Sequence, residues 1–502
     1  MSSPTDTPSP RPGLASPAPR RGGRDLTRGP IASTLLLFTL PGLGSTVLQS
    51  LNASINAVWI GHYLGEAALT ASSNANLLLF FLLGVVFGMS VANTVIVGQA
   101  VGAGNIDQAK RTVGTSTTFF GILSVLIAAF GYMETPRILA LMRTPPEAQA
   151  LAIAYLRVIF VALPFMYTYN FLMMALRGGG DSKTPFYFML LSVGLDIALN
   201  PVFIFGVGPI PALGIAGSAL STLVAQTVSL VAMVVFLYRR GHFLTIRRHE
   251  LHYFRIDPVI LKTLVRKGVP MGLQMLVISS SALAMISLVN GYGSQTTAAY
   301  GVASQLWTYI QMPALALGAS VSSMAAQNVG AGRWDRVAAV TRTGVLFNIV
   351  MTGALVGLML LFNRHSLGIF LPDDGAAIGI AQHINAIVSW TFILFGVTIV
   401  LFGTVRATGA VMPPLVILLI SVWGVRLPFA WLLEPHFGPD AIWWSFAVGS
   451  CVSLVLAVAY YRYGGWRRAR LMPAAGRGDG VPVGQVEDTG VAVQTATVVE
   501  RS

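Results

Sequence analysis

Asp196 is the acidic residue of this chain that stands most clearly in the middle of a long apolar stretch, S-V-G-L-D-I-A-L-N-P-V-F-I-F-G (192–206). Asn200 and Pro201 follow about one helical turn later. A helix places Asp196 and Asn200 on the same face, and proline frees backbone groups of the preceding turn. These oxygen atoms could bind and release a proton or ligate a small cation. The alternative is a structural aspartate that joins helices by hydrogen bonds.

A glycine-rich motif that occurs twice is the second candidate for chemistry. G-Q-A-V-G-A-G-N-I-D-Q-A (98–109) reappears as A-Q-N-V-G-A-G-R-W-D-R-V (326–337), 228 residues later. The first copy lacks the third glycine of a dinucleotide loop, and no G-x-x-x-x-G-K-[ST] sequence occurs in the chain. We therefore predict tight turns between helices, in which glycine permits a positive φ and aspartate caps a helix or pairs with a cation. The residues of these predicted structural hinge loops are Gly102, Gly104, Asp107, Gly330, Gly332 and Asp335.

The composition determines which elements must position these residues. The chain has 502 residues, of which 54% are hydrophobic and only 10% are charged. A soluble domain carries about 25% charged residues, and many apolar runs here approach the ~20 residues that cross a bilayer as a helix. The runs show no alternating β pattern, and a helix satisfies its own backbone hydrogen bonds in lipid. The sequence therefore predicts an all-α integral membrane protein.

Hydropathy places about twelve spans between the polar and glycine- or proline-rich breaks. The second and the eighth of these spans hold several Ser, Asn and Gln residues. The predicted spans are 31–58, 68–97, 112–134, 149–174, 185–207, 213–238, 265–291, 298–327, 340–362, 378–404, 412–433 and 441–462.

The recurrence of motifs divides these spans into two halves. L-R-G-G-G-D-S-K-T-P (176–185) faces V-R-A-T-G-A-V-M-P-P (405–414) at an offset of 229 residues, close to that of the glycine motif. A fixed offset is the signature of a repeat, and six spans in each half make the repeats parallel. We expect two pseudo-symmetric six-helix bundles around a central cavity, an N-lobe (29–238) and a C-lobe (264–463).

Charge predicts the topology. Arginine and lysine gather in the segments that are cytoplasmic if both termini are cytoplasmic, so most of the net charge of +13 reflects the positive-inside rule. The basic stretch 239–263 fits a solvated linker near anionic headgroups better than a nucleic-acid site. The two ends, 1–28 and 464–502, have no helical periodicity and are predicted to be disordered cytoplasmic tails.

In their order and spacing, the motifs resemble the multidrug and toxic compound extrusion (MATE) family of the wider polysaccharide and lipid exporter superfamily. The matching pieces run from V-W-I-G-H-Y-L-G-E-A-A-L-T-A (58–71) through the motifs above to K-G-V-P-M-G-L-Q (267–274) and M-P-A-L-A-L-G-A-S-V-S-S-M-A-A-Q-N-V-G-A-G (312–332). The resemblance covers about residues 31–463. It implies export of bulky, often cationic or amphipathic organic compounds, coupled to a proton or sodium gradient.

The resemblance also implies a cation pocket in the N-lobe, formed by Asn56, Asp196, Asn200 and Thr222. Many relatives carry an acid on the first helix where this chain has Asn56. The family pattern N-x-x-x-D-P on the fifth helix is here reversed to Asp196-x-x-x-Asn200-Pro201. One carboxylate where relatives often have two favours proton over sodium coupling. The seventh span carries no acid.

Aromatic and amide side chains in the middle spans are candidates for the substrate cavity, because flat rings attract organic cations. The alternative is that they fill contacts between helices. The candidates are Tyr167, Tyr169, Asn170, Gln274, Gln305 and Trp307.

Other functions are less well supported by the sequence. An enzyme or a structural metal site needs clustered acids, cysteines or histidines, whereas the histidines here fall in loops or at loop edges. A flippase for lipids or lipid-linked oligosaccharides shares the superfamily architecture and remains the alternative. We expect a monomeric, multi-pass protein of a bacterial cytoplasmic (inner) membrane that contacts lipid and small-molecule substrates but not nucleic acid. We expect no cofactor besides the coupling H⁺ or Na⁺.

Overall fold

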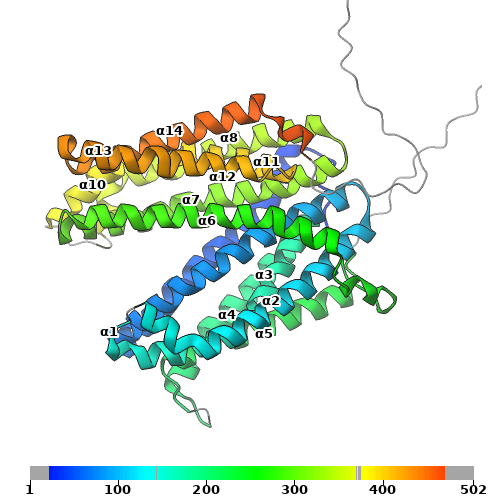
Figure 1. The fold of residues 1–502 in the computed structure, drawn as a ribbon, viewed down its shortest axis with the longest axis horizontal. Helices are drawn as coiled ribbons and strands as arrows, with labels where there is room; N and C mark the ends of the chain where they lie inside the picture. Colours follow the sequence, from blue (N-terminus) through cyan, green and yellow to red (C-terminus); the bar gives the residue numbers. More distant parts are fainter. Residues whose placement is uncertain (1–21, 143, 210, 369, 371–374, 470–502) are drawn as a thin grey trace, which may run out of the picture. The chain divides into compact units, whose positions relative to one another are not determined.

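A computed structural model describes residues 22–142, 144–209, 211–368, 370 and 375–469. Every regular element in these residues is a helix, as Figure 1 shows. The predicted all-α membrane class is therefore confirmed. The predicted tails lie largely outside the described residues, at 1–21 and 470–502.

The first half of the chain is built on α1 (Ile31–Gly102), which supplies two spans because it is interrupted at Gly65. Gly65 has φ 84° and ψ −178°, a conformation that glycine adopts without the clash of a Cβ atom. The helices that complete this half are α2 (Ile106–Leu141), α3 (Pro146–Gly178), α4 (Lys183–Phe205) and α5 (Ile215–Arg240).

The second half follows a short linker that contains η1 (Arg248–Phe254). Its long helices begin at proline or after glycine turns, and one of them passes through a π-helical segment, η2 (Leu419–Arg426). The remaining elements are α6 (Pro258–Asn290), α7 (Ser294–Gly330), α8 (Trp334–Leu361), α9 (Asn363–Gly368), α10 (Ala376–Val388), α11 (Thr391–Ala407), α12 (Met412–Leu418), α13 (Leu427–Phe437), α14 (Pro439–Tyr463) and η3 (Gly465–Arg468).

The described helices cover all twelve predicted spans. By length and composition alone, nine of them are able to cross a membrane, or ten if α10 and α11, bent by 44°, form one broken span. The second arm of α1 enters that search only as the shorter apolar helix Val86–Gly102, and α7 is not among the nine. Val86–Gly102 is too short for that count, whereas α7, with 37 residues, is long enough and is kept out by its polarity.

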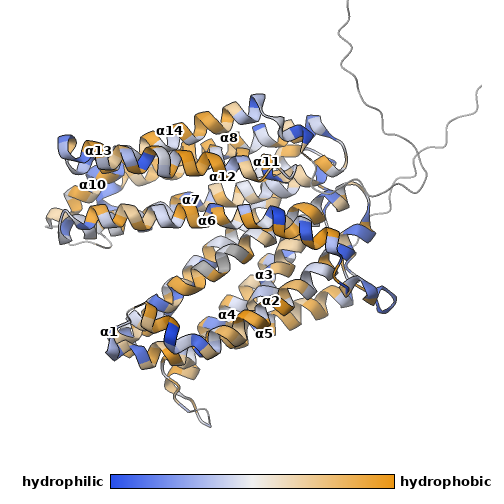
Figure 2. Ribbon diagram, viewed as in Figure 1, coloured by the Kyte–Doolittle hydropathy of each residue, from blue (hydrophilic) through white to orange (hydrophobic). Residues whose placement is uncertain are grey.

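Apolar side chains cover both the inside and the outside of the helices. Phe130 and Leu432 are 68% and 60% exposed in the middle or late part of their helices, and Figure 2 shows the apolar residues along the helix lengths. Such a surface would be unfavourable in water but is the surface that lipid tails solvate. The exposed faces are therefore expected to contact the bilayer.

The largest buried core belongs mainly to the first half and extends into the second half. That larger cluster contains Phe120, Phe160 and Phe171 of the first half. Its members from the second half include Ala325, Ala326 and Ala407, which lie at the ends of α7 and α11. The core thus indicates where the halves are in contact.

Candidate cation-coupling site and the contact between the halves

Asp196 lies on α4, at a place where α1 and α5 both approach that helix. The side chain is only 2% exposed, and Asn200, one turn later on α4, is completely buried. α1 contributes amide side chains and α5 contributes hydroxyl groups to this position. The site is therefore built from three spans of the first half.

The carboxylate of Asp196 accepts hydrogen bonds from four side chains. Oδ2 accepts from Nδ2 of Asn52 at 2.8 Å and from Nδ2 of Asn56 at 3.1 Å. Oδ1 accepts from the hydroxyl groups of Ser221 at 2.7 Å and Thr222 at 3.2 Å. A buried charge is tolerated when its oxygen atoms are paired in this way, so the surroundings match an ionised carboxylate.

Two further oxygen atoms of the cluster have no hydrogen-bond partner among the described residues. Asn200 donates through Nδ2 to Oδ1 of Asn56, while its own Oδ1 and the Oδ1 of Asn52 are buried without a hydrogen-bond donor among the described residues. An unsatisfied buried acceptor costs roughly 1–3 kcal/mol. A proton carried by the carboxyl group, or a cation ligated by oxygen, would each give such acceptors a partner.

The structure brings together all four residues of the predicted pocket and adds two that sequence reasoning missed. Asn56, Asp196, Asn200 and Thr222 are linked through the hydrogen bonds above. Asn52 is one helical turn before Asn56 and therefore shares its face, which is a signal that could have identified it. Ser221 had no such signal. It directly precedes Thr222, and only the rotation of α5 about its axis decides that both side chains face Asp196.

The predicted substrate-cavity residues are distributed over several environments. Tyr167 is completely buried and donates to the carbonyl group of Leu82, and Tyr169 is completely buried with an unpartnered hydroxyl group. Trp307 is 3% exposed and donates from Nε1 to Oδ1 of Asn385 at 2.9 Å. These three side chains belong to the cores of their bundles, and any role in substrate binding stays a prediction.

The amide candidates differ from one another in exposure. Gln274 is 4% exposed and donates to the carbonyl group of Val411 within the second half. Asn170 is half-buried and donates to its own helix at Met166. Gln305 is exposed and donates to the hydroxyl group of Tyr309. Asn170 and Gln305 are thus the predicted residues whose surfaces are most accessible.

The repeated glycine motifs form the predicted turns. Gly104 and Gly332 have φ angles of 78° and 71°, at equivalent places after α1 and α7. Asn105, rather than Asp107, caps α2, by accepting from the backbone N–H of Gln108. Asp107 instead pairs with Arg111 at 3.1 Å and accepts from the hydroxyl group of Tyr253. Asp335 lies exposed in the first turn of α8.

Gly102 and Gly330, the first glycines of the two V-G-A-G segments, have a different role, because each packs against the other half. A Cβ atom at Gly102 would lie 1.9 Å from the carbonyl oxygen of Gln327, and one at Gly330 would lie 2.0 Å from that of Gln99. Both neighbours are backbone atoms of the opposite bundle. Only glycine permits this approach.

Two glutamines at equivalent positions complete the contact. Gln99 donates through Nε2 to the carbonyl group of Ala407 at 2.6 Å, and Gln327 donates through Nε2 to that of Gly178 at 2.9 Å. Each bond joins one half to the end of a helix in the other half. We call these two bonds and the Gly102 and Gly330 contacts the reciprocal latch. It follows the 228-residue repeat and holds the halves together at the end of the molecule that carries the glycine motifs.

A short segment before α1, residues 22–30, lies across the latch, and we call it the N-terminal strap. Its backbone donates from Arg24 to the carbonyl group of Gly180 in the first half and from Leu26 to Oε1 of Gln327 in the second. Arg333 donates to the carbonyl group of Thr27 at 2.7 Å. The prediction of a disordered tail is therefore wrong for residues 22–28, because their backbone finds partners in both halves. At the other end, Trp466 is 1% exposed, so residues 464–469 are also part of the folded structure.

The strap is predicted to loosen in acid. Burial lowers the pKa of His242, which packs against Gly22, from its ordinary value of 6.5, and nearby Asp181 only partly opposes this. A lowered pKa means that the packed site disfavours the imidazolium ion. The contact therefore contributes its full stability above the ordinary pKa and loses it as the pH falls below that value.

Hydrogen exchange of residues 22–30, corrected for the intrinsic rate, is expected to be faster at about pH 5.5 than at about pH 7.5. His242→Gln should remove the difference, because glutamine does not titrate. A difference that persists in this variant would assign the effect to another group.

The sequence of this chain is similar to those of known proteins. The sequence model of the MatE family matches residues 41–202 and 270–432, two stretches that begin 229 residues apart. Probable multidrug resistance protein YoeA of Bacillus subtilis (strain 168) is 37% identical over 440 residues, which cover 87% of this chain and 95% of the relative. Probable multidrug resistance protein YpnP of the same organism is 33% identical over 452 residues, or 89% and 98% of the two chains.

The fold also resembles solved structures. A multidrug resistance MATE family transporter of the MOP superfamily, solved in an outward-facing conformation, superposes with a TM-score of 0.81 at 20% identity. The superposition covers 88% of this chain and 98% of that one. With both halves matched by the family model and 87% of the chain aligned to YoeA, the protein belongs to the MatE family.

Proposed function

We propose that the protein is a cation-coupled antiporter that exports organic, often cationic or amphipathic, compounds across the cytoplasmic membrane. The observation that carries the proposal is the Asp196 cluster, in which a buried carboxylate accepts from four donors beside two oxygen atoms that have no partner in the described part of the chain. An ionisable residue inside a membrane is costly and is most often retained for function. Relatives described as probable multidrug resistance proteins support the class of substrate.

Alternating access fits the distribution of contacts between the halves. The reciprocal latch joins the bundles at one end through hydrogen bonds and glycine contacts, which are interactions that two rigid bundles can break and form again. If both termini are cytoplasmic, the latched end is the cytoplasmic end. In that arrangement the expected central cavity between the two bundles opens to the outside of the cell.

Proton coupling is favoured over sodium coupling because the cluster contains a single carboxylate. A proton needs one carboxyl group and a nearby acceptor, and the free Oδ1 atoms of Asn52 and Asn200 are candidate acceptors. A sodium ion needs several oxygen ligands, which Asn52, Asn56, Asn200 and Thr222 would have to supply with Asp196. Asn52→Ala and Asn200→Ala are therefore expected to weaken a sodium site more than a proton site.

The test uses purified protein in proteoliposomes with a fluorescent organic cation. A pH gradient and a sodium gradient are imposed separately at matched membrane potential. Uphill movement with the pH gradient alone is the expected result. Movement that requires sodium would contradict proton coupling and would make the amide oxygens part of a sodium site. No movement with either gradient would contradict the antiporter and favour the lipid flippase.

A further inference from the structure

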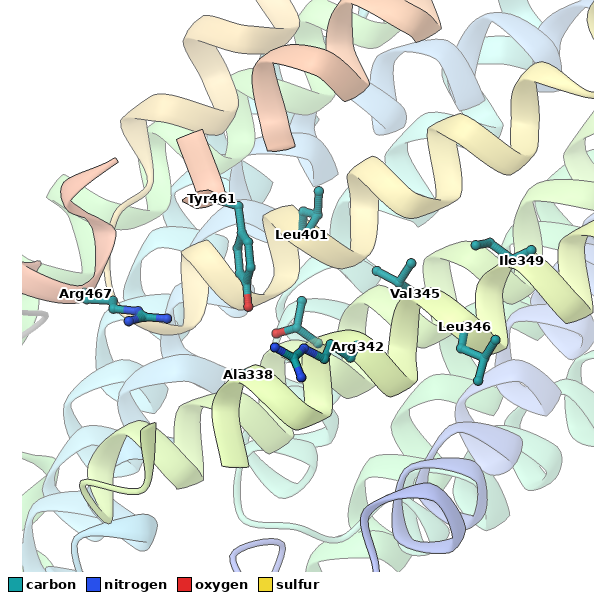
Figure 3. Close-up of a pocket in the computed structure, with 9 residues that line it drawn as sticks. Ala338, Arg342, Val345, Leu346, Ile349, Leu401, Tyr461 and Arg467 are labelled. Atoms are coloured by element: carbon teal, nitrogen blue, oxygen red, sulfur yellow. The ribbon is translucent and has the colours of Figure 1, made fainter. Parts of the chain in front are cut away.

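A cavity of about 370 Å³ is lined by residues of the second half and by none of the Asp196 cluster. Its walls come from α8, α11, the end of α14 and η3. Figure 3 shows Arg342 and Arg467 with their guanidinium groups on either side of the Tyr461 hydroxyl group, while Leu346 and Ile349 lie further along α8. One end of the cavity is thus cationic and the other is aliphatic.

The cationic end has no carboxylate beside it among the described residues. In the part of the chain that the structure describes, neither Arg342 nor Arg467 lies within 4 Å of a carboxylate. The guanidinium group of Arg467 lies 5.3 Å from the centroid of the Trp466 ring, and both arginine side chains are exposed. Two guanidinium groups that face one space repel each other unless a negative group lies between them.

Trp466, the residue before Arg467, is held in place by several contacts. Trp466 is 1% exposed, stacks on Tyr461 with ring centroids 5.0 Å apart, and donates from Nε1 to the carbonyl group of Tyr461 at 2.7 Å. Trp466 also contacts Trp334 at the start of α8. These contacts fix η3 against α8, so the position of Arg467 is determined by the fold and not only by its flexible side chain.

The aliphatic end follows an exposed side of α8. Leu346 and Ile349 are four and seven residues after Arg342, which places them on the same helix face about 6 and 10 Å further along the axis. They are 58% and 46% exposed, on a helix long and apolar enough to span the bilayer. The start of α8 is also bound to the N-terminal strap through Arg333, so the cationic end belongs to the side of the molecule that carries both described chain ends.

We propose that this cavity binds one anionic glycerophospholipid of the adjacent leaflet. Its phosphate lies between Arg342 and Arg467, within reach of the Tyr461 hydroxyl group, and an acyl chain follows Val345, Leu346 and Ile349. A lipid fits the cavity better than a free anion, because the continuous aliphatic wall would contact an acyl chain but not a soluble phosphate. Such a lipid would bridge α8 to η3.

The experiment titrates the purified full-length protein in neutral detergent with phosphatidylglycerol or phosphatidylcholine and measures the lipid concentration at half-maximal thermal stabilisation. Phosphatidylglycerol is expected to act at lower concentration. The double variant Arg342→Gln/Arg467→Gln is expected to raise its half-maximal concentration on the order of thirtyfold, from about 1 kcal/mol for each of the two arginines. Arg364→Gln, which removes an exposed arginine of α9 that does not line the cavity, is the control and should change nothing.

A second variant separates shape from charge. Ala338→Phe adds a ring to the cavity wall and keeps both arginines, so it should also weaken the response to phosphatidylglycerol. Equal responses to the two lipids, or an unchanged response in the double variant, would overturn the proposal. It would also be overturned if glycerol phosphate gave the same stabilisation as the lipid. A response that required removal of residues 470–502 would make the tail the occupant in the full chain and would contradict the proposal as well.

Discussion

Asp196→Asn is expected to abolish gradient-driven export while the protein stays folded and inserted. Asparagine keeps the shape of the side chain but neither carries a proton at neutral pH nor attracts a cation. It also presents an N–H₂ group to side chains that already donate, among them Asn52 and Ser221. Losing one acceptor in a buried network costs roughly 1–3 kcal/mol, which a protein of this size is expected to tolerate.

The measurement is the initial rate of uphill transport in proteoliposomes at equal protein content, together with the melting temperature of the purified protein. The expected rate equals that of liposomes without a gradient. Glu66→Gln is the matched control, because Glu66 is exposed and forms no ion pair among the residues that the structure describes. Gradient-driven transport at the wild-type rate in Asp196→Asn would remove this carboxylate from the mechanism.

Gly102→Ala is expected to prevent the latched end from closing and thereby to slow transport strongly. The added Cβ atom would lie 1.9 Å from the carbonyl oxygen of Gln327, far inside van der Waals contact. That oxygen belongs to the backbone of α7 and cannot rotate away, so the bundles must separate. Overpacking of this kind costs about 1–3 kcal/mol, which corresponds to a shift of roughly fivefold to 150-fold in the ratio of closed to open states. Gly330→Ala should have the same effect, because its Cβ atom would lie 2.0 Å from the carbonyl oxygen of Gln99.

The closure is measured as the distance between spin labels on the two halves, for example at Lys183 and Asp335, which are both exposed. Cys451, the single native cysteine, is exposed on α14 and is first replaced by serine. Longer distances are expected in both glycine variants. Gly121→Ala is the control, since a Cβ atom at Gly121 meets nothing within 4 Å. An unchanged distance distribution in Gly102→Ala would show that the latch does not determine the closed state.

The turns illustrate how far a motif can be interpreted without a structure. Positive φ angles were expected at the repeated V-G-A-G segments, and Gly104 and Gly332 adopt them. The contact of Gly102 and Gly330 with the opposite half was not predicted. A turn is a local property of a few residues, whereas a close approach between two helices depends on residues about 228 positions away.

The aromatic candidates show the opposite limit. Tyr167 and Trp307 have the ring types that would suit a cavity for organic cations, yet both are buried in the core of a bundle. In a membrane helix the lipid-facing and protein-facing sides are both apolar, so hydropathy does not reveal which way a ring points. For the same reason, the sequence did not show that Ser221 on α5 donates a hydrogen bond to Asp196.

By itself, the sequence determined the features that arise from local composition and from repetition. These are the helical membrane class, the two-half repeat, the glycine turns, and the pairing of Asp196 with Asn200 on one helix face. Only the tertiary structure decided which side chains meet across helices: Asn52 and Ser221 at Asp196, Gln99 and Gln327 in the latch, and the strap that crosses it. The physical reason is that the periodicity of a helix fixes its own faces, while the rotation and separation of neighbouring helices follow from packing between residues far apart in the chain.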